Sequence, residues 1–147
     1  MGSGQRQLRT YILVTGTTIK TGSDGNSKIE IIVENLGQTP ASDTSFQISG
    51  NYVSYPANVE DFVPNNPTMK SGGPLAPRVP LRLIAEGDMF INSSTVASCK
   101  KAVCVFGTIR YKDMFKKDHT TDFRLICVGE AIRERTFAQD RDGNKVT

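Results

Sequence analysis

Two successive stretches of alternating apolar and polar residues, joined by a short charged turn, occupy Lys101 to Val128. An alternation with a period of two residues is typical of a strand with one buried and one exposed face. Two such strands in succession predict one long β-hairpin with a common apolar face. The residues expected on that face are Val103, Val105, Gly107, Ile109 and Tyr111 in the first arm, and Thr121, Phe123, Leu125 and Cys127 in the second.

The register of this hairpin follows from placing both apolar faces on the same side. This condition predicts that Ile109 lies opposite Phe123, with the connection running through residues 115–117. The other expected pairs are Gly107 with Leu125 and Val105 with Cys127. A glycine in the middle of a strand indicates a bulge or a close approach by another backbone, and Gly107 is such a glycine.

Four further segments are rich in β-branched and aromatic residues and are bounded by turn formers, so each is predicted to be a strand. They are Leu8–Ile19, Lys28–Asn35, Ala41–Ser49 and Val79–Ala85. Residues 86–99 are ambiguous, with a short helical turn expected at Met89–Ile91 and a loop at residues 92–94. After the hairpin, Ala131, Ile132, Phe137 and Val146 are the residues able to anchor a polar C-terminal segment.

This pattern of short strands without a convincing amphipathic helix predicts an all-β fold. We expect an immunoglobulin-like antiparallel β-sandwich with about seven strands, without the tryptophan and paired cysteines of antibody domains. The expected domain spans residues 5–129, because residues 1–4 resemble a cloning remnant. Residues 130–147 are expected to form a polar tail or an edge strand.

Residues 50–78 interrupt the strand pattern, because they hold five of the seven prolines together with several asparagines and glycines. Proline lacks a backbone donor, so we expect no long regular element there. Long loops in compact domains are often functional, which makes this segment a candidate binding surface. The alternative is a passive crossover between the two sheets.

The chemistry of the chain argues against most enzymatic and nucleic-acid functions. The net charge is only +3, and His119 is the one histidine, so a multi-histidine metal site is excluded. The three cysteines cannot all pair, and with Cys104 expected outward and Cys127 inward we expect free thiols. We therefore expect no catalytic residue, no cofactor, no metal and no nucleic acid.

Several pieces of the sequence form a recognisable pattern. They are Leu8–Ile12, Glu34–Ala41, Gly107–Phe115 and His119–Thr121. The pattern resembles the soluble domain of uncharacterised proteobacterial membrane-anchored proteins, in which one or two transmembrane helices and a polar linker precede a β-domain that begins RAYV. Its most specific piece is NxGxTPA, here Asn35–Ala41, and Lys116 replaces the glycine that usually follows the turn phenylalanine. The resemblance implies a membrane tether and no catalytic residues.

Together these observations predict a non-catalytic interaction or sensing domain whose partner is a protein. The full-length protein is expected to be tethered to a membrane, on a side that the sequence leaves open, through helices outside this chain. The residues predicted as an interaction surface are Arg110, Lys112, Arg124, Glu60 and Asp61. Two alternatives stay open: self-assembly through an exposed edge strand, and a small-ligand site in the loop 50–78.

Overall fold

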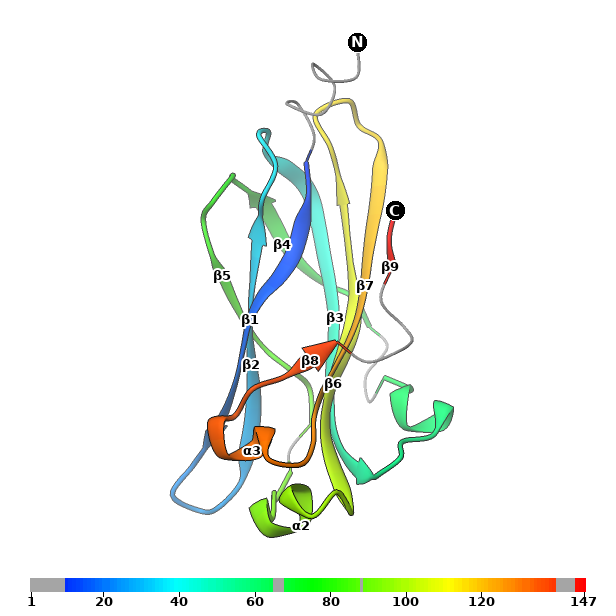
Figure 1. The fold of residues 1–147 in the computed structure, drawn as a ribbon. Helices are drawn as coiled ribbons and strands as arrows, with labels where there is room; N and C mark the ends of the chain where they lie inside the picture. The colour runs from blue at the N-terminus through cyan, green and yellow to red at the C-terminus, as the bar shows by residue number, and fades with distance from the viewer. Residues whose placement is uncertain (1–9, 65–67, 88, 140–144) are drawn as a thin grey trace.

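The structure is a computed structural model, and it describes residues 10–64, 68–87, 89–139 and 145–147. Residues 1–4 and the first two residues of the predicted strand Leu8–Ile19 lie outside the described residues. Two antiparallel sheets make up the fold (Figure 1). This arrangement confirms the predicted all-β sandwich.

The smaller sheet has the strand order β1-β2-β5, and the larger sheet has the order β4-β3-β6-β7-β8, with β9 also paired to β7. The strands are β1 (Ile12–Thr21), β2 (Ser27–Asn35), β3 (Ala41–Ser54), β4 (Lys70–Leu75), β5 (Leu81–Ile84), β6 (Lys101–Lys112), β7 (Asp118–Cys127), β8 (Ala138–Gln139) and β9 (Lys145–Val146). Three short helical segments connect them: η1 (Val59–Phe62), α2 (Ser93–Ala97) and α3 (Ala131–Glu134).

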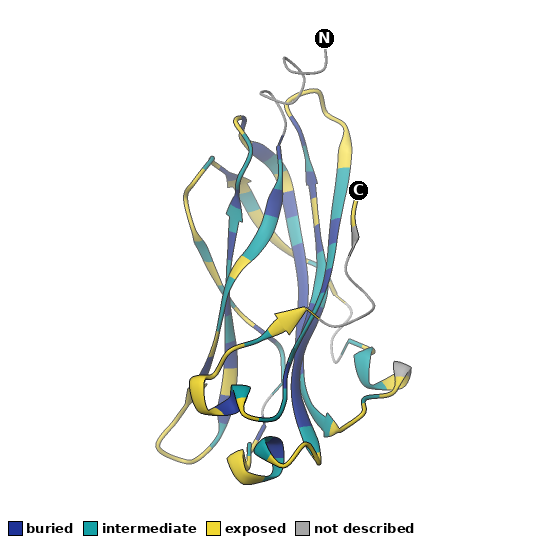
Figure 2. Ribbon diagram, in the orientation of Figure 1, coloured by how far each residue is buried: buried dark blue, intermediate teal, exposed yellow. Residues whose placement is uncertain are grey.

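Alternating side chains from both sheets fill the core. Ile29, Ile31 and Val33 of β2 are fully buried, as the period of two residues along this strand predicts. They belong to one cluster with Phe46 and Ile48 of β3 and with the inner face of the hairpin. Figure 2 shows this burial along the middle of the strands, with exposed residues gathered at the turns and ends. Burial of apolar area contributes about 25 cal/mol per Å², so this cluster is the main source of stability.

The β6–β7 hairpin forms as predicted, but its register is shifted by two residues. Ile109 lies opposite Thr121, whereas Phe123 lies opposite Gly107. The turn closes earlier than expected because the Asp113 carboxylate accepts hydrogen bonds from the backbone N–H groups of Phe115 and Lys117, at 2.8 and 3.0 Å. A shift of two residues keeps every side chain on its expected face, so the predicted inner face is still correct.

Gly107 is a point of close backbone approach, one of the two expectations for it. A Cβ atom at this position would collide with the carbonyl oxygen of Gln47 and would lie 3.0 Å from the Cα atom of Ile48. Gly107 therefore lets β3 and β6, the two longest strands, lie close together at the centre of the larger sheet.

In the described part of residues 50–78 the regular elements are short, as expected, but the segment is more regular than a single loop. β3 continues to Ser54, η1 follows, and residues 70–75 form β4 at the edge of the larger sheet. Pro74 is tolerated there because an edge strand has one side without ladder hydrogen bonds. Both glycines of β4 lie beside β3. Gly73 is paired with Thr44, and a larger residue at Gly72 would collide with the ring of Phe46.

The helical turn is also displaced from its expected position. Met89 forms a bridge with Ser27, and the helix α2 begins four residues later. The Asn92 side chain caps it by accepting hydrogen bonds from the N–H groups of Ser94 and Thr95, at 3.0 and 3.3 Å. Asparagine is among the preferred N-cap residues, so the predicted loop Asn92–Ser94 is in fact the start of the helix.

Candidate functional site

The predicted interaction residues of the hairpin all lie on the outer face of the larger sheet, but they do not form one patch. Arg110 is exposed, and the Lys112 ammonium forms an ion pair with Asp118 at 3.1 Å. The Arg124 guanidinium lies 3.7 Å from the ring centroid of Phe62, which belongs to η1. Arg124 is opposite Phe106 in the ladder, four residues from Arg110 along β6, a separation of about 13 Å.

The two predicted acidic residues lie in η1. Glu60 is exposed. Asp61 serves its own turn, because its carboxylate accepts a hydrogen bond from the N–H of Asn58 at 2.8 Å and its carbonyl accepts one from the Asn51 side chain at 2.6 Å. The segment that was expected to offer a contact surface therefore packs back onto the domain.

A further correction concerns the outer face of β6. Cys104 lies on the outer face of β6 as predicted, yet it is fully buried. Phe106, two residues further on, is also buried and makes an edge-to-face contact with Phe62 at 5.5 Å. The η1 segment thus covers part of the outer face. All three cysteines are free; Cys99 is the exposed one, and burial raises the pKa of the Cys127 thiol.

In the motif from Asn35 to Ala41, the side chain of Asn35 forms a bracket, that is, a set of hydrogen bonds that joins three parts of the chain. Asn35 is fully buried, and its side-chain oxygen accepts hydrogen bonds from the N–H groups of Tyr11 and Gly37. Its amide nitrogen donates to the carbonyls of Thr39, at 2.7 Å, and Leu75, at 3.2 Å. One side chain thereby joins the start of β1, the β2–β3 turn and the end of β4. The motif is explained by folding and needs no ligand.

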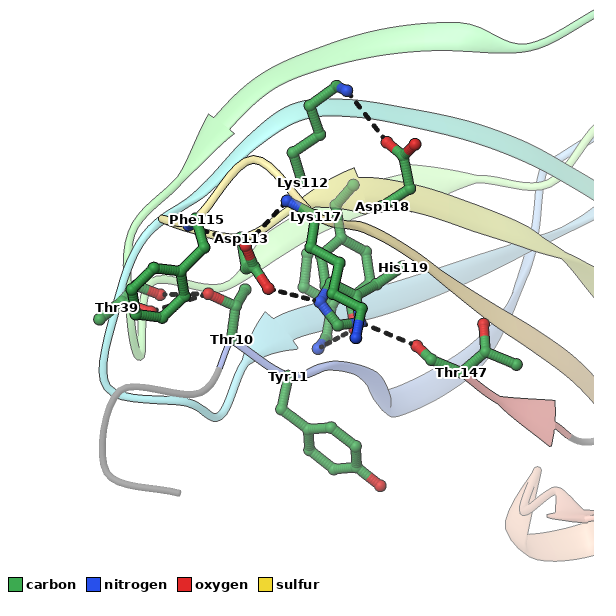
Figure 3. Close-up of polar contacts among 12 residues, drawn as sticks. Thr10, Tyr11, Thr39, Lys112, Asp113, Phe115, Lys117, Asp118, His119 and Thr147 are labelled. Carbon is green, nitrogen blue, oxygen red and sulfur yellow. Dashed lines mark hydrogen bonds and ion pairs between the residues drawn. The ribbon is translucent and has the colours of Figure 1, made fainter. Parts of the chain in front are cut away.

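His119 belongs to a polar cluster beside the hairpin turn (Figure 3). Its Nε2 lies 2.7 Å from a carboxylate oxygen of Asp113, and its Nδ1 lies 3.0 Å from the carbonyl oxygen of Thr147. The imidazole also stacks on Tyr111, with ring centroids 5.4 Å apart. Asp113 thus joins His119 to the turn backbone, which gives this cluster a structural role.

The Asp113 carboxylate makes stability depend on pH. Burial opposes its ionisation, but hydrogen bonds from His119 and from the backbone of Lys117 and Phe115 outweigh this effect, so the pKa of Asp113 lies below its usual value of 3.8. A carboxyl group whose pKa is lower in the folded than in the unfolded chain stabilises the fold above its unfolded pKa. That contribution is lost as the pH falls through the folded pKa.

We therefore expect Asp113→Asn to lower the free energy of unfolding by about 1 kcal/mol at neutral pH, because a charged acceptor is replaced by a neutral one. The difference between the two proteins should shrink as the pH falls below about 4. Urea unfolding at a series of pH values measures both effects. Glu30, whose pKa is lowered by Lys20 and Arg82, contributes the same acid sensitivity to both proteins. Parallel curves down to low pH would contradict this assignment.

A groove lies between the edges of the two sheets, and no sequence argument anticipated it. Two adjoining hollows, of about 590 and 270 Å³, share Val14 of β1, Leu125 of β7 and Gln139 of β8 among their lining residues. The lining of the groove along β1 consists of residues 13–18. Six residues of a strand correspond to about 20 Å.

Each end of the groove is closed by a polar contact to β1. At one end the Thr121 hydroxyl donates to the carbonyl of Ile12 at 2.8 Å, and the N–H of Ile12 donates to the Tyr111 hydroxyl at 3.4 Å. At the other end an Arg135 guanidinium nitrogen donates to the carbonyl of Ile19 at 3.2 Å. Between these contacts β1 pairs, within the described part of the chain, with β2 alone.

The composition of β1 differs from that of β4, which is an edge strand of the larger sheet. Natural edge strands are commonly protected by charges, prolines or bulges. β4 carries Lys70 and Pro74, whereas β1 has no proline and only Lys20, at its end. A bulge at Thr15 interrupts the pairing of β1 with β2, and Thr15 lines the groove. The low charge of this strand was the available sequence signal, but only the fold shows that it lies at an edge.

The described residues give little support to a metal site or to a small-molecule site in the segment 50–78. They contain no group of three histidine, cysteine or acidic side chains placed to hold a metal ion. The hollows lined by residues of the segment 50–78 have volumes of about 50 and 180 Å³. Typical small-molecule pockets are about 300 to 1,000 Å³. The β1 groove is therefore the better candidate for binding.

The fold and the groove define a small antiparallel β-sandwich domain in which the sheet edge at β1 lies along a groove. More particularly, the chain belongs to the family described as Domain of unknown function (DUF8453), whose sequence profile matches residues 3–127. No curated protein matches the chain. Among the described residues, no helix has the length and apolar character required to span a membrane.

Proposed function

We propose that this domain is a non-catalytic interaction module that captures an extended segment of a partner protein as an additional strand beside β1. The observation that supports this function is the open edge of β1, which lies along a groove closed at both ends. In recognition of this kind, hydrogen bonds between backbones provide affinity, and alternate side chains of the added strand provide specificity.

The lining of the groove suits such a segment. Val14, Leu125 and Phe137 are partly buried apolar residues that pack against the core. Thr15, Thr17 and Thr18 add hydroxyl groups along β1. An added strand would place one side chain in two against the apolar residues, since successive side chains point to opposite faces. We therefore expect the bound segment to be about six residues long, with alternating apolar positions.

The sequence pattern also supports a proposal about where this module acts. We propose that the full-length protein is tethered to a membrane, as the resemblance to membrane-anchored bacterial proteins implies. There the domain would capture a partner and hold it close to the surface. The predicted charged residues contribute less to this proposal, because Lys112 pairs with Asp118 and Arg124 stacks on Phe62.

A peptide selection tests the proposed function. Random peptides displayed on phage are selected on the purified chain, and amide hydrogen exchange is measured with and without a selected peptide. We expect added protection at residues 13–18 of β1. Thr15→Lys should weaken binding about tenfold, a loss of roughly 1.4 kcal/mol, because a charged side chain in the groove must lose water when a strand docks.

Ser23→Lys is the matched control, because Ser23 is exposed in the β1–β2 turn and the substitution adds the same charge outside the groove. Its peptide affinity should equal that of the original chain. Protection confined to the outer face of β6 and β7, or equal binding by both lysine variants, would contradict the proposed site.

Self-assembly is the second candidate, and the same open edge favours it. The β1 strand of another copy could occupy the groove through antiparallel pairing about a twofold axis. Sedimentation over a range of concentrations separates the candidates. Peptide capture predicts a monomer at all concentrations, whereas self-assembly predicts association that Thr15→Lys weakens.

A further inference from the structure

Three turns meet at the end of the sandwich where the described chain begins at Thr10 (Figure 1). They are residues 36–40, 76–80 and 113–117, which connect β2 to β3, β4 to β5 and β6 to β7. The N–H of Arg78 donates to the carbonyl of Asn35 at 3.0 Å, and the hydroxyls of Thr10 and Thr39 lie 2.8 Å apart. These contacts hold the first two turns and the start of the chain together.

The third turn belongs to the same end because Lys112, the last residue of β6, lies opposite Ser42, at the beginning of β3. Residues 113–117 therefore extend past the start of β3, beside the turn that precedes it. The hairpin turn is thus an outermost part of this end of the molecule.

Exposed apolar side chains and cations alternate over these turns. Val79, Met114 and Phe115 have 52, 49 and 67 % of their surface exposed. The same turns carry three exposed cations: Arg78 precedes Val79, and Lys116 and Lys117 follow Phe115. The one carboxylate within the three turns, Asp113, is buried and turned toward His119.

Acidic residues just outside the turns reduce this positive charge only partly. Asp118 follows the hairpin turn and is paired with Lys112 at 3.1 Å. Asp43 is exposed on β3, beyond the turn that precedes that strand. The exposed charges of the three turns themselves are all positive.

The backbone supplies a second observation. Lys116 and Arg78 have φ angles of 63° and 66°, in the left-handed region where glycine is the least strained residue. A residue with a Cβ atom costs roughly 1 kcal/mol or more in this conformation. Within the three turns, both left-handed positions carry a cation in place of glycine, at a cost to folding; Asp43, just beyond the first turn, is also left-handed, with a φ angle of 49°.

We infer that this end of the domain docks on an anionic lipid surface, with Phe115 and Met114 inserted among the lipid head groups and Lys116, Lys117 and Arg78 held against their negative charges. Apolar and aromatic side chains with lysine and arginine beside them are typical of interfacial membrane contacts. Lysine is depleted in protein–protein interfaces, which argues against a protein partner here. This inference concerns a different surface from the β1 groove and does not depend on the proposed peptide binding.

The absence of tryptophan from the chain allows a direct test. Phe115→Trp places a single fluorescent reporter at the hairpin turn. Vesicles of equal parts phosphatidylcholine and phosphatidylglycerol are added to the full chain carrying this substitution. We expect the emission to shift to shorter wavelength, because the indole leaves water, and we expect added salt to reverse the shift.

Phe90→Trp is the matched control, because Phe90 is 68 % exposed and lies beside Gly25 in the β1–β2 turn, at the opposite end of the sandwich. Its emission should not change. Adding Lys116→Gln and Lys117→Gln to the Phe115→Trp chain should weaken vesicle binding about 30-fold, which corresponds to about 1 kcal/mol for each lysine. Thermal unfolding verifies that each variant is folded.

Three results would overturn the inference: no shift with the anionic vesicles, an equal shift for both reporters, or an equal shift with vesicles of phosphatidylcholine alone. Absence of vesicle binding combined with weaker peptide capture by the lysine variants would instead assign these turns to a protein partner. Failure of peptide selection alone would affect only the proposed function, because the vesicle experiment uses no peptide.

Discussion

Asn35→Ala is expected to lower the free energy of unfolding by about 4 kcal/mol, which shifts the melting temperature down by roughly 12 °C. The substitution removes four hydrogen bonds at a fully buried position. It leaves the N–H groups of Tyr11 and Gly37 and the carbonyls of Thr39 and Leu75 without these partners. Each buried polar group that loses its partner costs about 1 to 3 kcal/mol. Chemical denaturation of both proteins measures the difference.

Two further substitutions test whether the lost hydrogen bonds of Asn35 cause the loss of stability. Asn92→Ala is the matched control, because Asn92 is an exposed cap with two acceptor contacts, and its loss should cost about 1 kcal/mol. Asn35→Asp keeps the oxygen acceptor but loses both donors and places a carboxylate against two carbonyl groups. It should therefore be as destabilising as Asn35→Ala near neutral pH. A loss below about 1 kcal/mol for Asn35→Ala would contradict the role of the bracket.

Gly107→Ala is expected to lower the free energy of unfolding by about 3 kcal/mol, because the added methyl group would meet backbone atoms of β3 that have no room to move. The collision is with the carbonyl oxygen of Gln47 and the Cα atom of Ile48. Relief would require β3 and β6 to separate at the centre of the larger sheet. Thermal and urea unfolding measure the loss.

Gly22→Ala is the matched control for this prediction. A Cβ atom at Gly22 would lie 3.0 Å from the side-chain oxygen of Asp24, which can move away. Alanine also has less freedom in the unfolded chain, so the change should be within about 1 kcal/mol of zero. Equal effects at the two glycines would show that the approach of β3 to β6 is not the cause.

The prediction for the hairpin shows how far alternation can be used. A period of two residues determines which face each side chain occupies, and the inner face of β6 and β7 was predicted correctly. Two registers that differ by two residues place the same side chains on each face, so alternation alone hardly distinguishes them. The hydrogen bonds of the Asp113 side chain to the turn backbone decide between them, and they place Ile109 opposite Thr121.

The outer face of the larger sheet shows a second limit. Cys104 and Phe106 are on the face that alternation assigns to solvent, yet both are buried, and Phe62 of η1 packs against Phe106. Several of the residues predicted as an interaction surface instead make contacts within the domain. Asp61 and Arg124 take part in the packing of η1, and Lys112 pairs with Asp118 across the hairpin. The contacts of η1 with the hairpin join segments more than 40 residues apart, for example Phe62 with Phe106 and Arg124, and no local pattern contains them.

The sequence by itself determined the all-β class, the positions of most strands and the core face of the hairpin, and it marked Gly107 as a bulge or a close approach. Each of these depends on the local alternation and size of side chains. Only the tertiary structure decided the hairpin register, the β4 edge strand, the bracket built by Asn35, the groove beside β1 and the meeting of the three turns near Thr10. These features depend on which distant strands become neighbours, and that choice is made by packing of the whole core.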